Sequence, residues 1–220
     1  MASLQEKTQK AIDTFSARCG DAFGDSLVSV ILHGAAVRGD MAKDTHLTFM
    51  VTLADNTPSE LAGVSGDIHK WEKQHIAVPL FVTRDYIDSS LDTFPLEFMT
   101  MKTAYRVIRG EDVLENAAFE RADVRSQCER EIKGKLLHLR AEYLSLRGDK
   151  KKLADLVSRS LSTFRLLFTG ALYLAEREAT GTMPALLDAV TDAYGLDENL
   201  FRELQAFAGK AKEYNDDNAD

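Results

Sequence analysis

The sequence predicts an α+β protein, with a mixed sheet and flanking helices in its first half and an antiparallel helical bundle in its second. Up to about residue 115, strand-type and helix-type hydrophobic patterns alternate. From about residue 120 onward, only helix-type patterns occur, joined by short connections. We therefore expect an α/β domain over 1–117, a four-helix bundle domain over 118–214 and a disordered tail over 215–220.

The first half begins with a helix over 4–19, where apolar residues recur at helical spacing. Apolar, β-branched segments predict strands over 26–33, 46–53 and 75–83. The second of these places Leu47, Phe49, Val51 and Leu53 on one face, and Pro79 gives the third an edge position. A helix is expected from Pro58 to Trp71, another helical segment broken near Pro95, and a short strand that ends at Gly110.

The second half shows one apolar stripe on each of two long helices. The first stripe steps by three or four residues and predicts a buried face formed by Val124, Cys128, Ile132, Leu136, Leu139, Tyr143 and Leu146. Gly148 and Asp149 end this helix, and the second stripe runs from Leu153 to Leu174. A third helix starts after Thr182 and stops at Gly195, and Asp197 is the expected N-cap of a fourth.

Composition limits the kinds of partner. The chain of 220 residues has a formal net charge of −8, which argues against general nucleic-acid binding because phosphate backbones favour clustered positive charge. No apolar run approaches the length of a membrane span, so no membrane partner is expected. Cys19 and Cys128 fit neither a metal motif nor a disulfide framework, and we expect two reduced thiols in a cytoplasmic protein.

The segment VSVILHGAAVRGD, residues 28–40, is the main candidate for a functional site. It is an apolar strand that ends at His33, followed by a glycine turn and a basic residue, Arg38. Together with the next strand, THLTFMVTL, it resembles the nucleotidyltransferase superfamily, of the polymerase beta and kanamycin nucleotidyltransferase type. The helical second half agrees with that resemblance. The resemblance implies a Gly-Ser turn that contacts phosphate, an Asp-x-Asp pair at the start of the next strand, a third carboxylate on a later strand, and bound Mg²⁺.

The chain departs from this pattern at several positions. Gly34 matches the family glycine, but Ala35 replaces the serine. Asp44 can match the first aspartate and is the candidate metal ligand, whereas His46 replaces the second, in a loop shorter than the family's. The third strand contains no acidic residue, and Asp85 just beyond it is the nearest substitute. Because Mg²⁺ prefers oxygen ligands and a two-metal site needs several carboxylates, we expect no ordinary nucleotidyl transfer.

Simpler interpretations stay open for each of these residues. Gly34 can serve only the turn, Arg38 can be a solvated loop residue, and Asp44 can cap a turn. His46 lacks partners at metal spacing, and His33 can merely end its strand. Salt bridges on a solvated helix face, such as those of Lys133 and Lys135 with glutamates four residues away, explain the basic residues of the first long helix: Arg130, Lys133, Lys135, Arg140 and Arg147.

Three hypotheses for function follow. The first is a catalytically degenerate nucleotidyltransferase-like protein, a pseudoenzyme, that binds a nucleotide through Gly34, Ala35 and Arg38, or a protein partner, in a cleft between sheet and bundle. The second is an active Mg²⁺-dependent transferase whose carboxylates are Asp40, Asp44 and Asp85. The third is an antitoxin-like interaction protein without a small ligand, and a bundle face that pairs with a second copy is compatible with each.

Overall fold

The computed structural model describes residues 4–41, 45–179, 181–197, 199–204 and 206–207. Contacts divide the chain into two compact units, 1–91 with 101–118 and 92–100 with 119–220. The sequence suggested one boundary, at 117/118, whereas residues 92–100 also group with the helical unit. They do so because Leu96 and Met99 pack in one cluster with Val124 and Cys128. The predicted tail over 215–220 lies outside the described residues.

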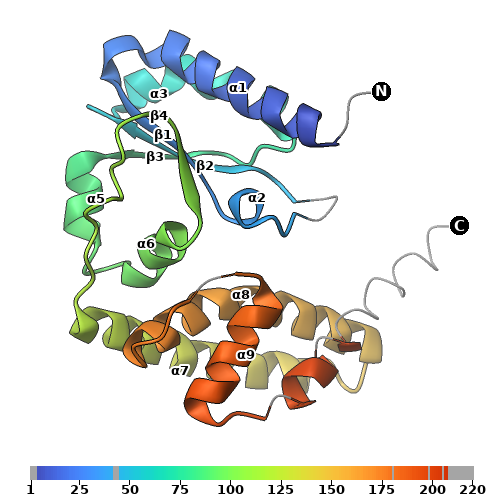
Figure 1. Ribbon diagram of the computed structural model, residues 1–220. Coiled ribbons are helices and arrows are strands. Elements are labelled where there is room, and N and C mark those ends of the chain that lie inside the picture. The colour runs from blue at the N-terminus through green and yellow to red at the C-terminus, as the bar shows by residue number, and fades with distance from the viewer. Residues whose placement is uncertain (1–3, 42–44, 180, 198, 205, 208–220) are drawn as a thin grey trace, which may run out of the picture. The chain divides into compact units, whose positions relative to one another are not determined.

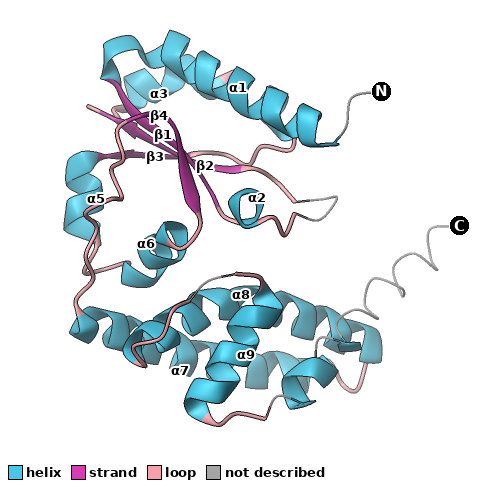
Figure 2. Cartoon of the chain, in the orientation of Figure 1, coloured by secondary structure: helices cyan, strands magenta, loops and turns pink. Residues whose placement is uncertain are grey.

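A four-stranded mixed sheet forms the centre of the first unit (Figure 2). Its strands are β1 (Leu27–His33), β2 (Thr48–Leu53), β3 (Leu80–Thr83) and β4 (Tyr105–Gly110), in the order β3-β2-β1-β4. β1 is antiparallel to β2 and β4, while β2 is parallel to β3. The mixed sheet and the edge position of the third strand are confirmed. β3 begins directly after Pro79, because proline has no N–H to donate to the ladder.

One face of the sheet is covered by α1 (Leu4–Phe23) and α3 (Pro58–Ser65) (Figure 1). Phe15 of α1 stacks on Phe49 of β2 with ring centroids 4.1 Å apart, and it meets Trp71 edge-on at 5.0 Å. The predicted buried face of β2 is therefore confirmed, since all four of its residues lie in this core: Leu47, Phe49, Val51 and Leu53. The single helix expected up to Trp71 is interrupted, and α4 (Ile68–Lys73) follows α3 after a turn.

Three short helical segments complete the first unit: η1 (Gly24–Ser26), α2 (Ala35–Arg38) and α5 (Arg84–Ser90). Thr83 at the end of β3 caps α5, because its hydroxyl oxygen accepts the N–H of Tyr86 at 3.1 Å. Strand and helix thus follow each other without a loop at this end of the sheet.

The helical unit contains α7 (Arg121–Ser145), α8 (Lys150–Leu174), α9 (Met183–Tyr194) and most of α6 (Pro95–Lys102). Asp149 caps α8 by accepting the N–H of Lys152 at 3.1 Å. Gly195 ends α9 with a left-handed conformation, φ 61°. The predicted cap at Asp197 is confirmed, since its carboxylate accepts the N–H of Asn199 at 2.9 Å.

The apolar stripe of α7 is only half buried. Val124 and Cys128 are 0% and 5% exposed, as expected, but Ile132, Leu136 and Tyr143 are 51%, 45% and 62% exposed, so this part of the core prediction is wrong. The reason lies in the packing of α9, which joins α8 in an apolar cluster around Phe168 and Leu172. In the described part of the chain, the outer face of α7 therefore has no helix packed over it.

Both cysteines, Cys19 and Cys128, are buried and free, in agreement with the prediction. Across the described residues, no helix combines the length and the apolarity that a bilayer crossing requires.

Candidate functional site

Gly34 connects β1 to the short helix α2 through a conformation that only glycine adopts readily, φ 81° and ψ −145°. A Cβ atom there would lie 3.1 Å from Oγ1 of Thr48 on β2. Gly34 donates its N–H to the carbonyl oxygen of Ala104 at 2.9 Å. The turn therefore depends on glycine both for its backbone conformation and for its close approach to β2.

The turn presents fewer free N–H groups than its sequence suggests. Val37 and Arg38 donate their N–H groups to the carbonyl oxygen of Gly34 at 3.0 and 3.1 Å, and Gly34 is also engaged. The N–H groups of Ala35 and Ala36 have no acceptor among the described residues, as is normal for the first residues of a helix. An anion at this turn would thus meet two backbone donors rather than five.

Arg38 is not a solvated loop residue. Its side chain is 13% exposed, and Nε donates to Oδ2 of Asp40 at 3.1 Å. The pair is local, and Asp40 also donates its N–H to the carbonyl oxygen of Ala35 at 3.2 Å. Asp40 therefore neutralises Arg38, which weakens Asp40 as a metal ligand and Arg38 as a phosphate ligand.

His33 is the last residue of β1 and pairs with Thr48 on one side and Tyr105 on the other. Burial, with a smaller contribution from the positive charge of Arg38, lowers the pKa of His33 to about 4. Its imidazole is consequently neutral at pH 7. The carbonyl oxygen of His33 accepts the hydroxyl of Thr48 at 2.7 Å, so this hydroxyl is already engaged within the protein.

The start of β2 offers no pair of carboxylates in its described part. Leu47 and Phe49 face the core, so His46, which replaces the second aspartate of the resemblance, and Thr48 take the opposite face. The ring centroids of His46 and His75 lie 5.7 Å apart, so the neighbour of His46 is a second imidazole rather than a carboxylate. Asp44, the candidate metal ligand, lies outside the described residues.

Asp85 lies at the opposite end of the sheet. β3 runs parallel to β2, and Thr83 pairs with Leu53, the last residue of β2, whereas Thr48 and Gly34 are at the other end. A strand of six residues spans about 16 Å at roughly 3.3 Å per residue, and two-metal sites need carboxylates that share ions about 4 Å apart. Asp85 therefore does not complete a metal site with Asp40. Nor does any cluster of three or more His, Cys, Asp or Glu side chains suited to a metal ion occur in the described chain.

A pocket in the helical unit was not evident from the sequence. It is lined by residues of α7, α8 and α9, with Arg121 and Arg125 of α7 among them. Sequence reasoning considered basic residues farther along the same helix, where Lys133 and Lys135 prove to be paired with Glu129 and Glu131, each at 3.5 Å. The α7 stripe keeps the same spacing through Ile132, so the sequence carried no signal that this part of the helix is uncovered.

Neither the family models nor the curated proteins include a match to this chain. Among solved structures, the chain is similar to a spectinomycin adenyltransferase from Enterococcus faecialis, crystallised with ATP and spectinomycin. The two share 11% sequence identity, the match covers 93% of this chain and 99% of that chain, and the TM-score is 0.42. At this identity and TM-score, the likeness assigns no role to any residue of this chain.

Proposed function

We propose that this chain is a nucleotidyltransferase-like protein that binds a nucleotide at the Gly34 turn without transferring it. The observation that carries this proposal is the start of β2, where His46 replaces the second aspartate of the resemblance and lies, with Thr48, on the face opposite the core. In its backbone, a strand next to a Gly-bearing turn and within a mixed sheet is the arrangement that the sequence resemblance implies.

The chemistry of these side chains argues against two-metal catalysis. Mg²⁺ requires oxygen ligands in nearly octahedral geometry, and an imidazole such as that of His46 suits zinc or copper better. The hydroxyl of Thr48 is bonded to His33, Asp40 is bonded to Arg38, and Asp85 is at the far end of the sheet. Without a bridging carboxylate, two ions cannot be held close together.

Weak binding of a phosphate remains compatible with the same residues. Ala35 and Ala36 each present an N–H group at the turn, and the guanidinium of Arg38 is in the same turn. Since Asp40 offsets the charge of Arg38 and His33 is neutral at pH 7, we expect a nucleotide affinity in the high micromolar to millimolar range and no requirement for Mg²⁺.

Two measurements test the proposal. The first is incorporation of labelled ATP, GTP, CTP or UTP into any acceptor with Mg²⁺ or Mn²⁺, for which we expect no product. The second is titration of the protein with each nucleotide in EDTA, followed by backbone amide NMR, for which we expect shifts at Ala35 and Ala36. Metal-dependent incorporation that is abolished by Asp44→Ala would contradict the proposal and support the active transferase.

A variant separates binding at the turn from binding elsewhere. Ala35→Pro removes one N–H at the first residue of α2, a position that tolerates proline, and we expect affinity to fall about tenfold with the loss of one bond to a charged ligand. Lys150→Pro places proline at the equivalent first position of α8 and is the matched control. Equal affinities of the two variants for ATP would place the nucleotide away from the Gly34 turn.

A further inference from the structure

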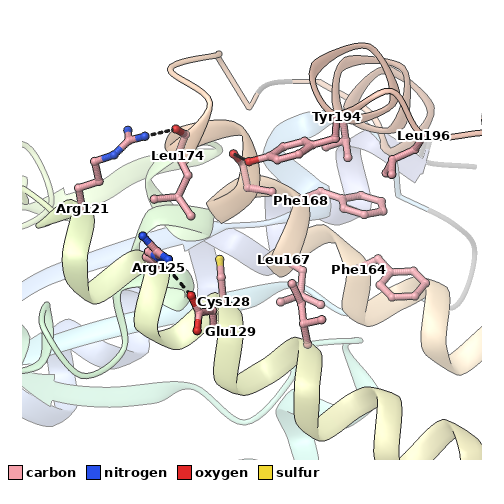
Figure 3. A pocket seen from close by; sticks show the side chains of 13 residues that line it. Arg121, Arg125, Cys128, Glu129, Phe164, Leu167, Phe168, Leu174, Tyr194 and Leu196 are labelled. Atoms are coloured by element: carbon pink, nitrogen blue, oxygen red, sulfur yellow. Dashed lines mark hydrogen bonds and ion pairs between the residues drawn. The ribbon is translucent and has the colours of Figure 1, made fainter.

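The helical unit contains an open pocket of about 580 Å³ between α7, α8 and α9 (Figure 3). This volume lies within the range typical of small-molecule sites, roughly 300–1,000 Å³. The pocket exists because α9 packs on α8 and leaves the neighbouring face of α7 uncovered within the described residues. It lies entirely within one compact unit.

The floor and walls of the pocket are apolar. Cys128, Leu167 and Phe168 are 5%, 5% and 8% exposed and form its inner surface. Phe164 and Phe168 stack with centroids 5.5 Å apart, so one wall is aromatic. A ligand body that fills this space must itself be apolar, because polar atoms would lose their hydrogen bonds to water there.

Charged groups are confined to the rim (Figure 3). Arg121 donates to the carbonyl oxygen of Leu174 at 2.5 Å, which fixes its side chain to α8. Arg125 donates from Nε to Glu129 at 3.0 Å, and Glu129 is shared with Lys133 at 3.5 Å. Two cations, Arg125 and Lys133, thus share one lining carboxylate, while Arg121 is paired with Glu176 at 3.6 Å. The Arg125 side chain is 73% exposed and accessible to a ligand.

We propose that this pocket binds an apolar organic anion, with an aromatic or branched aliphatic body in the pocket and a carboxylate or sulfonate at Arg125. Shape and charge both support this class. The apolar floor excludes the polyphosphate of a nucleotide, whose oxygens would find no donors there, whereas a single anionic group can stay at the wet rim. The proposal is independent of nucleotide binding at Gly34.

A pair of fluorescent probes tests the anion requirement. 1-Anilinonaphthalene-8-sulfonate and N-phenyl-1-naphthylamine share an aromatic body, and only the first has a sulfonate. We expect the full-length protein to bind the sulfonate at a single site by calorimetry, with an affinity three- to fivefold higher than that for the neutral amine, as is usual for an exposed ion pair.

Variants locate the site. Arg125→Ala is expected to remove the preference for the sulfonate and leave binding of the neutral amine unchanged. Arg130→Ala, an exposed arginine of the same helix that does not line the pocket, is its control. Ala171→Leu adds a side chain to the pocket wall and is expected to lower the affinity for both probes at least tenfold, while the same change at exposed Ala141 has no effect.

Two results would overturn the proposal. Equal loss of sulfonate affinity in Arg125→Ala and Arg130→Ala would indicate non-specific attraction to the helix. Unchanged binding in a folded Ala171→Leu variant would place the probe elsewhere. If that variant does not fold, the two arginine variants still decide, because both side chains are exposed.

Discussion

Replacing His33 by glutamine should remove most of a stability loss that the protein suffers in mild acid. Burial and Arg38 lower the pKa of His33 in the folded protein to about 4, whereas the ordinary value is 6.5. In the unfolded chain the imidazole therefore takes up a proton first as the pH falls. The neutral histidine contributes fully to stability above pH 6.5, and its contribution is lost as the pH falls toward 4.

The magnitude follows from the two pKa values. Each unit of difference corresponds to roughly 1.4 kcal/mol, and at pH 4.5 the loss attributable to His33 amounts to about 2.5 kcal/mol. We expect the free energy of unfolding of the wild type to fall by this amount more than that of His33→Gln between pH 7 and pH 4.5. Other acid effects are common to both proteins and cancel in the comparison.

Urea titration at the two pH values measures this difference. The single tryptophan, Trp71, is 3% exposed in the core of the same unit, so its fluorescence reports the unfolding of the unit that contains His33. His69→Gln is the control, because the side chain of His69 is 77% exposed and no buried imidazole is lost. An identical pH dependence in wild type and His33→Gln, or a midpoint near 6.5 for His33 by NMR, would refute the reasoning.

Three further predictions concern stability and reactivity. Gly34→Ala should lower the free energy of unfolding by about 2–3 kcal/mol, because φ 81° and ψ −145° are strained for alanine and its Cβ would crowd Thr48. Gly39 has a left-handed φ of 82° and open space around it, so Gly39→Ala should cost only about 1 kcal/mol in the same urea titration. Equal losses in the two variants would argue against the contact with Thr48. Gln127→Leu should cost about 1–3 kcal/mol in thermal unfolding, because the side-chain amide of Gln127, 3% exposed, accepts the N–H of Leu96 at 2.9 Å and donates to Glu97 at 2.7 Å. A variant as stable as the wild type would show that these two bonds make no net contribution to stability. Burial raises the pKa of Cys19 to about 12 and that of Cys128 to about 11, so both thiols stay protonated at pH 8 and should react slowly with a disulfide reagent. In denaturant, two thiols per chain should react at once. Rapid reaction of the folded protein would contradict the buried positions of the two cysteines.

Local patterns predicted much of the candidate site. The strand that ends at His33, the turn at Gly34 and the alternation of β2 all follow from residues close together in the sequence. The hydrogen-bond partners of the turn do not. Gly34 bonds to Ala104, which is 70 positions away, and Arg38 is occupied by Asp40 rather than by solvent. Asp85 was a plausible metal ligand until the parallel pairing of β3 with β2 placed it at the wrong end of the sheet.

By itself, the sequence determined the α+β class, the cap at Asp197, the stop at Gly195 and the inward face of β2, because each depends on hydrophobic periodicity and backbone chemistry within a few residues. Only the tertiary structure decided which apolar stripe is covered. The stripe of α7 has the same period from Val124 to Tyr143, yet it is buried at one end and exposed at the other. Periodicity shows that a face is suited to burial, but burial itself requires a second surface, and the position of that surface is set by contacts between segments far apart in the chain.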